Sequence, residues 1–175
     1  MSAINEKHNF TFEFRPVTKL FEEQVRLHPD KCAAATSKES LTYSQLNEKA
    51  NRIANSLIEK GVGREVIVGV VLDRCCDFYA VRQGILKAGG AFAVAAPDYP
   101  DDRIQFIFED AGVPFIITTK DIADERKDLF SKLPAAVLLL EELLEHDNAS
   151  NPDVKISEHD LCYCIYTSGS TGKPK

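Results

Sequence analysis

The sequence contains no apolar run near the roughly 18 residues that a membrane-spanning helix requires. Residues 1–14 are polar and lack the apolar core of a signal peptide. Lys and Arg residues are scattered along the chain, and the formal net charge at pH 7 is -6. These absences predict a cytoplasmic protein without a membrane segment and without the clustered positive charge of a nucleic-acid-binding surface.

The spacing of zinc-binding cysteines is also absent. The chain has five cysteines, and none of them form the C-x2-C pairs that are typical of zinc sites. The closest spacings are those of the adjacent Cys75 and Cys76 and of Cys162 and Cys164, which are separated by one residue. We therefore expect no metal site, and we interpret the cysteines as reduced thiols that pack in the core.

The composition is that of a single globular α/β unit. The 175 residues are 44% hydrophobic and 27% charged, close to the values of about 45 to 50% and about 25% in soluble proteins. Segments with helical spacing alternate with short apolar runs, which predicts a mostly parallel sheet flanked by helices. The predicted helices span 17–27, 43–60, 77–88, 102–111, 121–133 and 141–145, and the predicted strands span 32–36, 65–72, 91–95, 115–118, 136–140 and 161–166.

Helix boundaries are marked by specific residues. Thr42 and Gln45 have the spacing of a capping box, in which each side chain bonds to the backbone of the other residue. Gly61 stands where the helix that follows should end in a left-handed residue. Asp101 or Asp102 is the predicted N-cap of a later helix.

The segment Thr167–Lys175 has an unusual composition and directly follows the apolar run 161–166, which we expect to be a central strand. It packs four hydroxyls, two glycines and two lysines into nine residues. Glycines let backbone N–H groups approach an anion, hydroxyls donate to its oxygens and lysines neutralise its charge, so the segment suits a polyphosphate. Its position agrees, because ligands of open α/β sheets bind beyond the carboxyl ends of the strands.

The same segment has two other interpretations. A flexible linker can share the Ser-Gly-Ser-Thr-Gly composition, but it requires neither the lysines nor the preceding strand. A Walker A loop requires G-x4-G-K-[ST], whereas here two residues separate Gly169 from Gly172, and Pro174 follows Lys173. The spacing therefore excludes a Walker A loop.

Residues 166–175, Tyr-Thr-Ser-Gly-Ser-Thr-Gly-Lys-Pro-Lys, resemble the phosphate-loop signature of the adenylate-forming superfamily. Residues 41–52 and 86–104, the latter opening on Leu-Lys-Ala-Gly-Gly-Ala-Phe, resemble the peptide-synthetase branch of that superfamily. The three motifs occur in the family order. The resemblance favours an amino-acid adenylation domain of a nonribosomal peptide synthetase over acyl-CoA or luciferase-type relatives.

This resemblance implies an α/β fold that is the first part of the large N-terminal subdomain of an adenylate-forming enzyme. Residues 1–16 would be an N-terminal extension, and residues 17–175 an incomplete adenylation domain. The implied reaction has two steps: ATP and an amino acid give an aminoacyl adenylate and pyrophosphate, and the acyl group then passes to a carrier-protein thiol. The implied cofactors are ATP, Mg2+ and the phosphopantetheine of the carrier, and other synthetase domains are implied partners.

The resemblance also implies roles for the loop residues. The cofactor-binding residues would be Thr167, Ser168, Gly169, Ser170, Thr171, Gly172 and Lys173. The hydroxyls among them would contact the phosphates, the glycines would permit the turn, and Lys173 would be a weaker contact. Lys175 would be catalytic, because it would accompany the departing pyrophosphate.

Two features depart from the family pattern. Residues 93–97 are Ala-Val-Ala-Ala-Pro where the family usually has Val-Pro-Ile-Asp-Pro, so Ala96 replaces a carboxylate and the local turn is in question. The amino-acid pocket, the adenine and ribose contacts and the C-terminal lid lie downstream in the family. We therefore expect residues 1–175 to be inactive alone, and to self-associate through the unfinished edge of the sheet.

Two other functions remain as alternatives. A non-catalytic binding or interaction module could use the same fold. A phosphate-binding NTPase of another kind would require a catalytic base. The histidines lie in polar stretches that are typical of solvated side chains, and they are His8, His28, His146 and His159.

Overall fold

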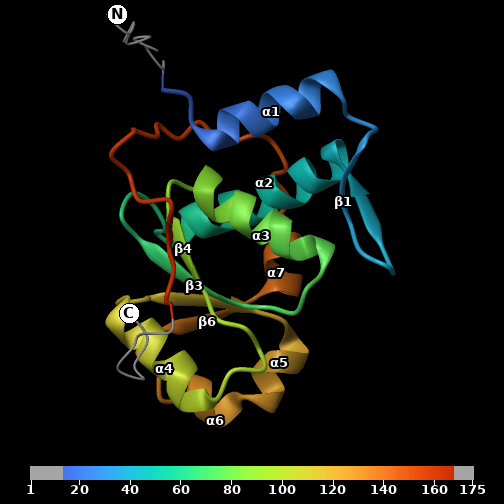
Figure 1. Cartoon of the computed structure of the whole chain (residues 1–175). Helices are drawn as coiled ribbons and strands as arrows, with labels where there is room; N and C mark the ends of the chain where they lie inside the picture. Colours follow the sequence, from blue (N-terminus) through green and yellow to red (C-terminus); the bar gives the residue numbers. More distant parts are fainter. Residues whose placement is uncertain (1–13, 168–175) are drawn as a thin grey trace, which may run out of the picture.

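Residues 14–167 are described by a computed structural model, in which a parallel sheet separates two layers of helices (Figure 1). The helices are α1 (Val17–Leu27), α2 (Tyr43–Glu59), α3 (Cys76–Lys87), α4 (Asp101–Asp110), α5 (Lys120–Glu125), α6 (Lys127–Phe130) and α7 (Leu140–Leu144). The strands are β1 (Cys32–Ala35), β2 (Ser40–Thr42), β3 (Ile67–Val71), β4 (Ala91–Val94), β5 (Phe115–Thr118), β6 (Ala136–Leu139) and β7 (Tyr163–Cys164). The predicted α/β class is confirmed.

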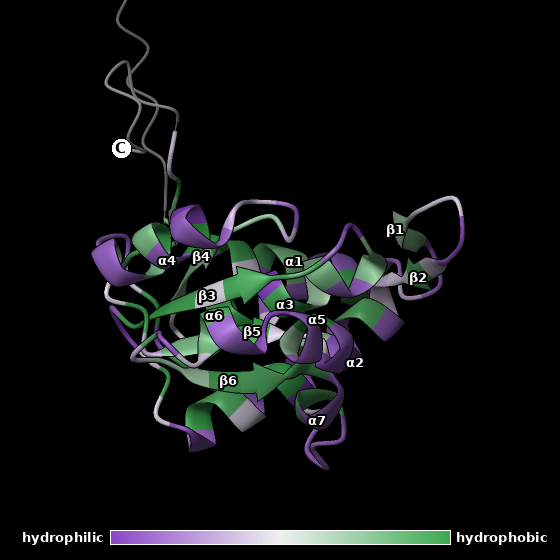
Figure 2. Ribbon diagram, turned by 90° about the horizontal axis from the view of Figure 1, so that it is seen from below, coloured by the Kyte–Doolittle hydropathy of each residue, from purple (hydrophilic) through white to green (hydrophobic). Residues whose placement is uncertain are grey.

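The main sheet has the order β6-β5-β3-β4-β7, and every neighbouring pair in it is parallel. Its central strand, β3, lies within the predicted strand 65–72, and its side chains are buried on both faces of the sheet. Val68 and Val70 pack in the core cluster beneath α2, α3 and α7, whereas Val71 packs in the cluster beneath α4, α5 and α6. Figure 2 shows these hydrophobic strands between helices whose outer surfaces are hydrophilic.

Helix α2 begins and ends as its sequence predicts. The Gln45 amide donates to the Thr42 hydroxyl at 3.2 Å, and the Thr42 amide donates to the Gln45 side chain at 2.9 Å. Gly61 has φ +90, the left-handed conformation that glycine adopts without a steric penalty. Helix α3 packs closely on α2, since a Cβ at Gly84 would lie 2.6 Å from Ile53 Cγ2.

Several predicted boundaries are wrong. Pro100 is the N-cap residue of α4, so Asp101 and Asp102 lie in the first turn, where their charges favour the positive end of the helix. The predicted helix 121–133 is two short helices separated at Arg126. Strand β2, which the sequence analysis does not predict, pairs with β1 in an antiparallel hairpin.

The run 161–166 is not a central strand in this structure. Strand β7 pairs only with β4 and forms the edge of the described sheet. Leu161, Tyr163 and Ile165 are 46%, 56% and 67% exposed, respectively. A strand is central only when another strand pairs with each of its two sides, and within residues 14–167 only β4 pairs with β7.

The cysteines are free, as predicted, but they are not all core residues. Cys76 is buried, whereas Cys32 and Cys162 are exposed, and Cys75 and Cys164 are half-buried. The expectation of core thiols is therefore correct for Cys76 alone.

The histidines partly match their prediction. His159 is exposed, and His28 is half-buried. The His146 side chain is only 16% exposed and contacts Glu59 at 3.2 Å, so it is more buried than predicted. His8 lies outside the described residues.

Candidate phosphate-binding edge of the sheet

Thr167 is the one predicted phosphate-binding residue within the described part of the chain, and it follows β7 at the carboxyl end of that strand. The other predicted site residues lie outside the described residues: Ser168, Gly169, Ser170, Thr171, Gly172, Lys173 and Lys175. The structure therefore describes the base of the predicted loop and the surface around it.

Helix α4 holds the residue that precedes Thr167. The Tyr166 hydroxyl donates to Asp110 Oδ2 at 2.6 Å, and the Tyr166 ring meets the Phe106 ring edge-on at a centroid distance of 6.3 Å. Burial raises the pKa of Tyr166, and the hydrogen bond and negative charge of Asp110 raise it further. The hydroxyl therefore keeps its proton at neutral pH and remains a donor to Asp110.

A cavity of about 890 Å³ lies at the same edge of the sheet, beyond the carboxyl ends of β3 and β4. Because β3, β4 and β7 are parallel, the end of β7 belongs to this edge too. Open α/β sheets bind their ligands there. The cavity is lined by Ala35, Thr36, Leu72, Asp73, Arg74, Cys75, Phe78, Tyr79, Val94, Ala96, Pro97 and Asp98.

The chemistry of that cavity does not provide a strong phosphate site by itself. The Cys76 amide at the start of α3 donates to Glu39 Oε1 at 2.7 Å, so a carboxylate of the chain already occupies the positive end of this helix. Burial raises the pKa of Cys75, so its thiol is protonated at neutral pH and is a poor nucleophile.

The turn at Ala96 forms without the carboxylate that the family usually has. The Tyr99 amide donates to the Ala96 carbonyl oxygen at 3.0 Å. The Arg126 guanidinium donates to the carbonyl oxygens of Pro97 and Tyr99 and pairs with Asp101. Arg126 thus ties this turn to the α5–α6 boundary, and the local backbone does not depend on a side chain at position 96.

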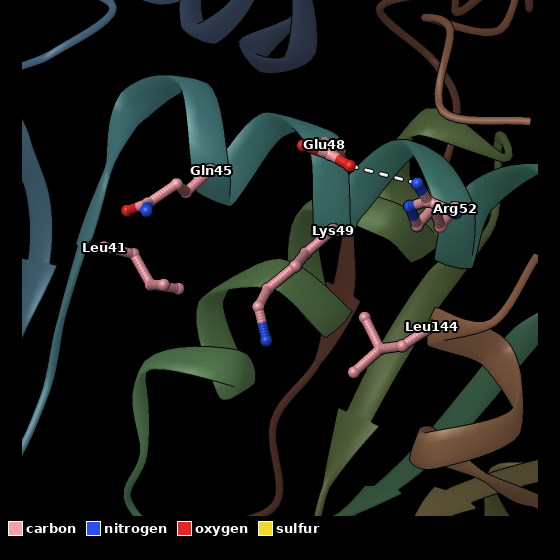
Figure 3. A pocket seen from close by; sticks show the side chains of 6 residues that line it. All are labelled: Leu41, Gln45, Glu48, Lys49, Arg52 and Leu144. Carbon is pink, nitrogen blue, oxygen red and sulfur yellow. Dashed lines mark hydrogen bonds and ion pairs between the residues drawn. The ribbon is translucent and has the colours of Figure 1, made fainter.

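A smaller groove of about 320 Å³ lies beside α2 and α7, and two basic side chains, Lys49 and Arg52, line it (Figure 3). Both of them are already paired. Arg52 bonds to Glu48 at 3.0 Å, and Lys49 bonds to Asp77 at 2.7 Å. Arg52 also donates to the His146 carbonyl oxygen at 2.6 Å. With these charges satisfied, the groove is better explained by helix packing than by ligand binding.

Metal-ligating side chains do not cluster within residues 14–167, where no three His, Cys, Asp or Glu residues are arranged to hold an ion. In the same residues, no helix combines the length and the apolar character that crossing a membrane requires.

The chain matches a known protein family over most of its length. The AMP-binding enzyme family matches residues 21–175. The chain belongs to this family. Zwittermicin A synthase ZmaJ of Bacillus cereus is 44% identical over 159 residues, which cover 91% of this chain and 30% of that synthase.

Solved structures of similar fold include a nonribosomal peptide synthetase. The nonribosomal peptide synthetase FmoA3 with bound α-methyl-L-serine-AMP superposes with a TM-score of 0.80 at 32% identity, covering 92% of this chain and 17% of that one. VinN in complex with 3-methylaspartate has a TM-score of 0.80 at 26% identity, covering 92% of this chain and 46% of that one. The chain spans less than half the length of each of these three relatives.

Asp110, Glu39 and Arg126 are the residues at this edge that sequence reasoning missed. Asp110 lies 56 positions before its partner Tyr166. Glu39 lies 37 positions before Cys76, and Arg126 lies 27 positions after Tyr99. No local pattern joins residues at such separations.

Proposed function

We propose that this chain is the N-terminal part of an amino-acid adenylation domain in a nonribosomal peptide synthetase. The parent enzyme activates an amino acid with ATP, releases pyrophosphate and transfers the aminoacyl group to the phosphopantetheine thiol of a carrier protein. One observation carries the proposal: the Gly, Ser, Thr and Lys segment begins at the carboxyl end of a parallel strand, in a chain of the AMP-binding enzyme family.

The loop residues keep their implied roles in this proposal. Thr167, Ser168, Ser170 and Thr171 donate hydroxyl hydrogen bonds to the ATP phosphates, while Gly169 and Gly172 let the backbone turn closely around them. Lys173 adds positive charge. Lys175 stabilises the negative charge that grows on the pyrophosphate oxygens as the α-phosphorus is attacked.

The relatives supply the substrate class. FmoA3 is known with bound α-methyl-L-serine-AMP and also in an AMPPNP-bound form, and VinN with L-aspartate. These molecules are an aminoacyl adenylate, an ATP analogue and an amino acid, which are the kinds of ligand that amino-acid adenylation requires.

Residues 1–175 by themselves are proposed to be inactive and to self-associate. They span 30% of the ZmaJ synthase and 46% of VinN. The exposed apolar side chains of β7 and its flanks lie along an unpaired strand edge, which a second copy can cover. Residues 1–16 are proposed to be an extension that precedes the domain, and the cytoplasmic location stays a prediction from sequence.

The test of the function is amino-acid-dependent exchange of pyrophosphate into ATP by the longer enzyme that contains this chain, measured with a panel of amino acids. Exchange stimulated by one or a few amino acids is expected. Exchange above a no-enzyme blank by residues 1–175 alone would contradict the proposed inactivity. ATP binding by the longer protein without exchange for any amino acid would favour a non-catalytic module instead.

A further inference from the structure

Lys87 has a buried ammonium group at the meeting point of four segments. Its side chain is 1% exposed, yet it lies in the Leu-Lys-Ala-Gly-Gly-Ala-Phe motif, to which the adenylation chemistry assigns no task. The ammonium Nζ contacts an oxygen atom of four side chains, namely Glu22 at 3.1 Å, Asn47 at 2.8 Å, Asn51 at 2.8 Å and Asn151 at 2.7 Å. A buried cation tolerates such a place only with partners of this kind.

One of these partners belongs to the connection between α7 and β7, residues 145–162, which we call the strap. Asn151 is a strap residue, whereas Glu22 lies on α1, and Asn47 and Asn51 lie on α2. Figure 1 shows the strap, in orange to red, crossing beside α1 before it descends to the sheet. The ammonium therefore ties the strap to three helices at once.

Helix α2 holds the same part of the strap through its side chains. The Asn51 amide nitrogen donates to the Ala149 carbonyl oxygen at 2.8 Å, while its oxygen accepts from Lys87. The Asn55 amide donates to the carbonyl oxygens of Asn148 and Ser150, both at 3.0 Å. Since the ammonium fixes which way the Asn51 amide points, Lys87 also orients a strap contact that it does not touch.

The residues after Lys87 contact the strap again, in chain order. A Cβ on Gly89, whose φ is +82, would lie 3.0 Å from Val154 Cγ1, so glycine leaves room for this strap side chain. The Phe92 amide donates to the Cys162 carbonyl oxygen at 3.3 Å, and Phe92 pairs with Tyr163 of β7. The motif 87–92 is thus a template along which the strap runs to β7.

We propose that Lys87 is a positioning residue, which fixes the strap through Asn151 and Asn51 and thereby sets where β7 and Thr167 leave the sheet. The link to ATP rests on the proposed function, because Thr167 opens the predicted phosphate loop. Lys87 itself does not touch the nucleotide in this proposal. It acts on the position of β7. A second contact holds the strap in the same way, because Arg64 pairs with the strap residue Asp160 at 2.7 Å.

The test compares Asn151→Ala with Asn47→Ala, because each removes one hydrogen bond to the same ammonium and only the first releases the strap. Amide hydrogen exchange is followed at Phe92, whose amide is protected by the Cys162 carbonyl. We expect Asn151→Ala to speed this exchange about tenfold, and Asn47→Ala to leave it within about twofold. Asn151→Asp restores an acceptor and should restore protection.

Equal exchange at Phe92 in the two alanine variants, or no rescue by Asn151→Asp, would overturn the positioning role. This measurement needs no nucleotide, so it stands even if ATP binding, and with it the proposed function, fails. In the longer enzyme, Asn151→Ala should raise the KM for ATP about three- to tenfold with little change in kcat, and Asn47→Ala should not. An unchanged KM beside faster exchange would overturn the link from the strap to the loop.

Discussion

The Lys87 centre and the β7 edge distribute polar and apolar groups in opposite ways. At the centre a charged ammonium is 1% exposed and meets four oxygen partners. At the edge, Tyr163 and Ile165 are apolar or aromatic and are 56% and 67% exposed. Burying a charge costs several kcal/mol unless it is fully paired, whereas exposing apolar surface leaves a place for contact. The first region is therefore complete within this chain, and the second is a surface that is open to a partner.

The largest effect that distinguishes the two regions should come from Lys87→Met. This change removes the shared Lys87 donor from the side-chain oxygens of Glu22, Asn47, Asn51 and Asn151. Breaking a buried charged cluster in this way typically costs about 3 to 5 kcal/mol. Urea unfolding measures this loss of stability. Lys155→Met, an exposed strap lysine without a described partner, is the matched control and should stay within about 0.5 kcal/mol. Equal stability of the two variants would mean that the centre contributes nothing beyond its alkyl packing.

Lys175→Ala in the longer enzyme tests the predicted phosphate-binding loop 167–175. Loss of one contact that strengthens in the transition state typically costs about 2.7 to 4 kcal/mol, or roughly 100- to 1000-fold in rate. The adenylation rate should therefore fall more than ATP affinity. The control is Ser44→Ala, since Ser44 is exposed on α2. Parental adenylation rates in Lys175→Ala would leave the loop with a structural role alone.

The β7 edge itself is tested by Ile165→Lys. A charge on an exposed strand edge opposes pairing with a second copy without disturbing the buried core. We expect the self-association of residues 1–175 to weaken at least about tenfold, equivalent to about 1.4 kcal/mol, with unchanged unfolding by urea. Light scattering at high micromolar concentration measures the association. A monomeric wild-type chain under those conditions would contradict the interface.

A smaller effect is expected from a change at the start of α2, the helix that carries Asn47 and Asn51. Thr42→Ala removes the hydroxyl that accepts from the Gln45 amide. N-cap losses of this kind typically cost about 1 kcal/mol. Thermal unfolding measures it, and Thr42→Ser should keep most of the stability. If alanine and serine were equally tolerated, the capping box would be unimportant for α2.

The smallest effect should be a dependence on pH through Glu22. Burial raises the pKa of Glu22, but hydrogen bonds and charges from Lys19 and Lys87 outweigh it, so the pKa lies below its usual value of 4.5. This carboxylate therefore stabilises the fold fully above pH 4.5 and loses that contribution as pH falls through the folded pKa. The Tm difference between wild type and Glu22→Gln should shrink below pH 4.5. A constant difference across this range would rule out the linkage.

Local signals account for what could be predicted. The capping box at Thr42, the left-handed Gly61 and the buried strand β3 all depend on residues a few positions apart, and all three are confirmed. The helix predicted over 121–133 failed because Arg126 leaves the helix to hold the turn at Pro97. The prediction that 161–166 is a central strand failed because the position of a strand in a sheet depends on its neighbouring strands. The residues of the run carry no information about those neighbours.

The sequence by itself determined the alternation of helices and strands, the family and the loop 167–175 as the predicted phosphate site. Its patterns have periods of two to four residues and short motifs, which act through neighbouring backbone atoms. The tertiary structure alone decided the partners of Lys87, which lie up to 65 positions away, and the hydrogen bond from Tyr166 to Asp110. These choices follow from which side chains the packed sheet and helices bring within hydrogen-bond distance, and no local pattern encodes that distance.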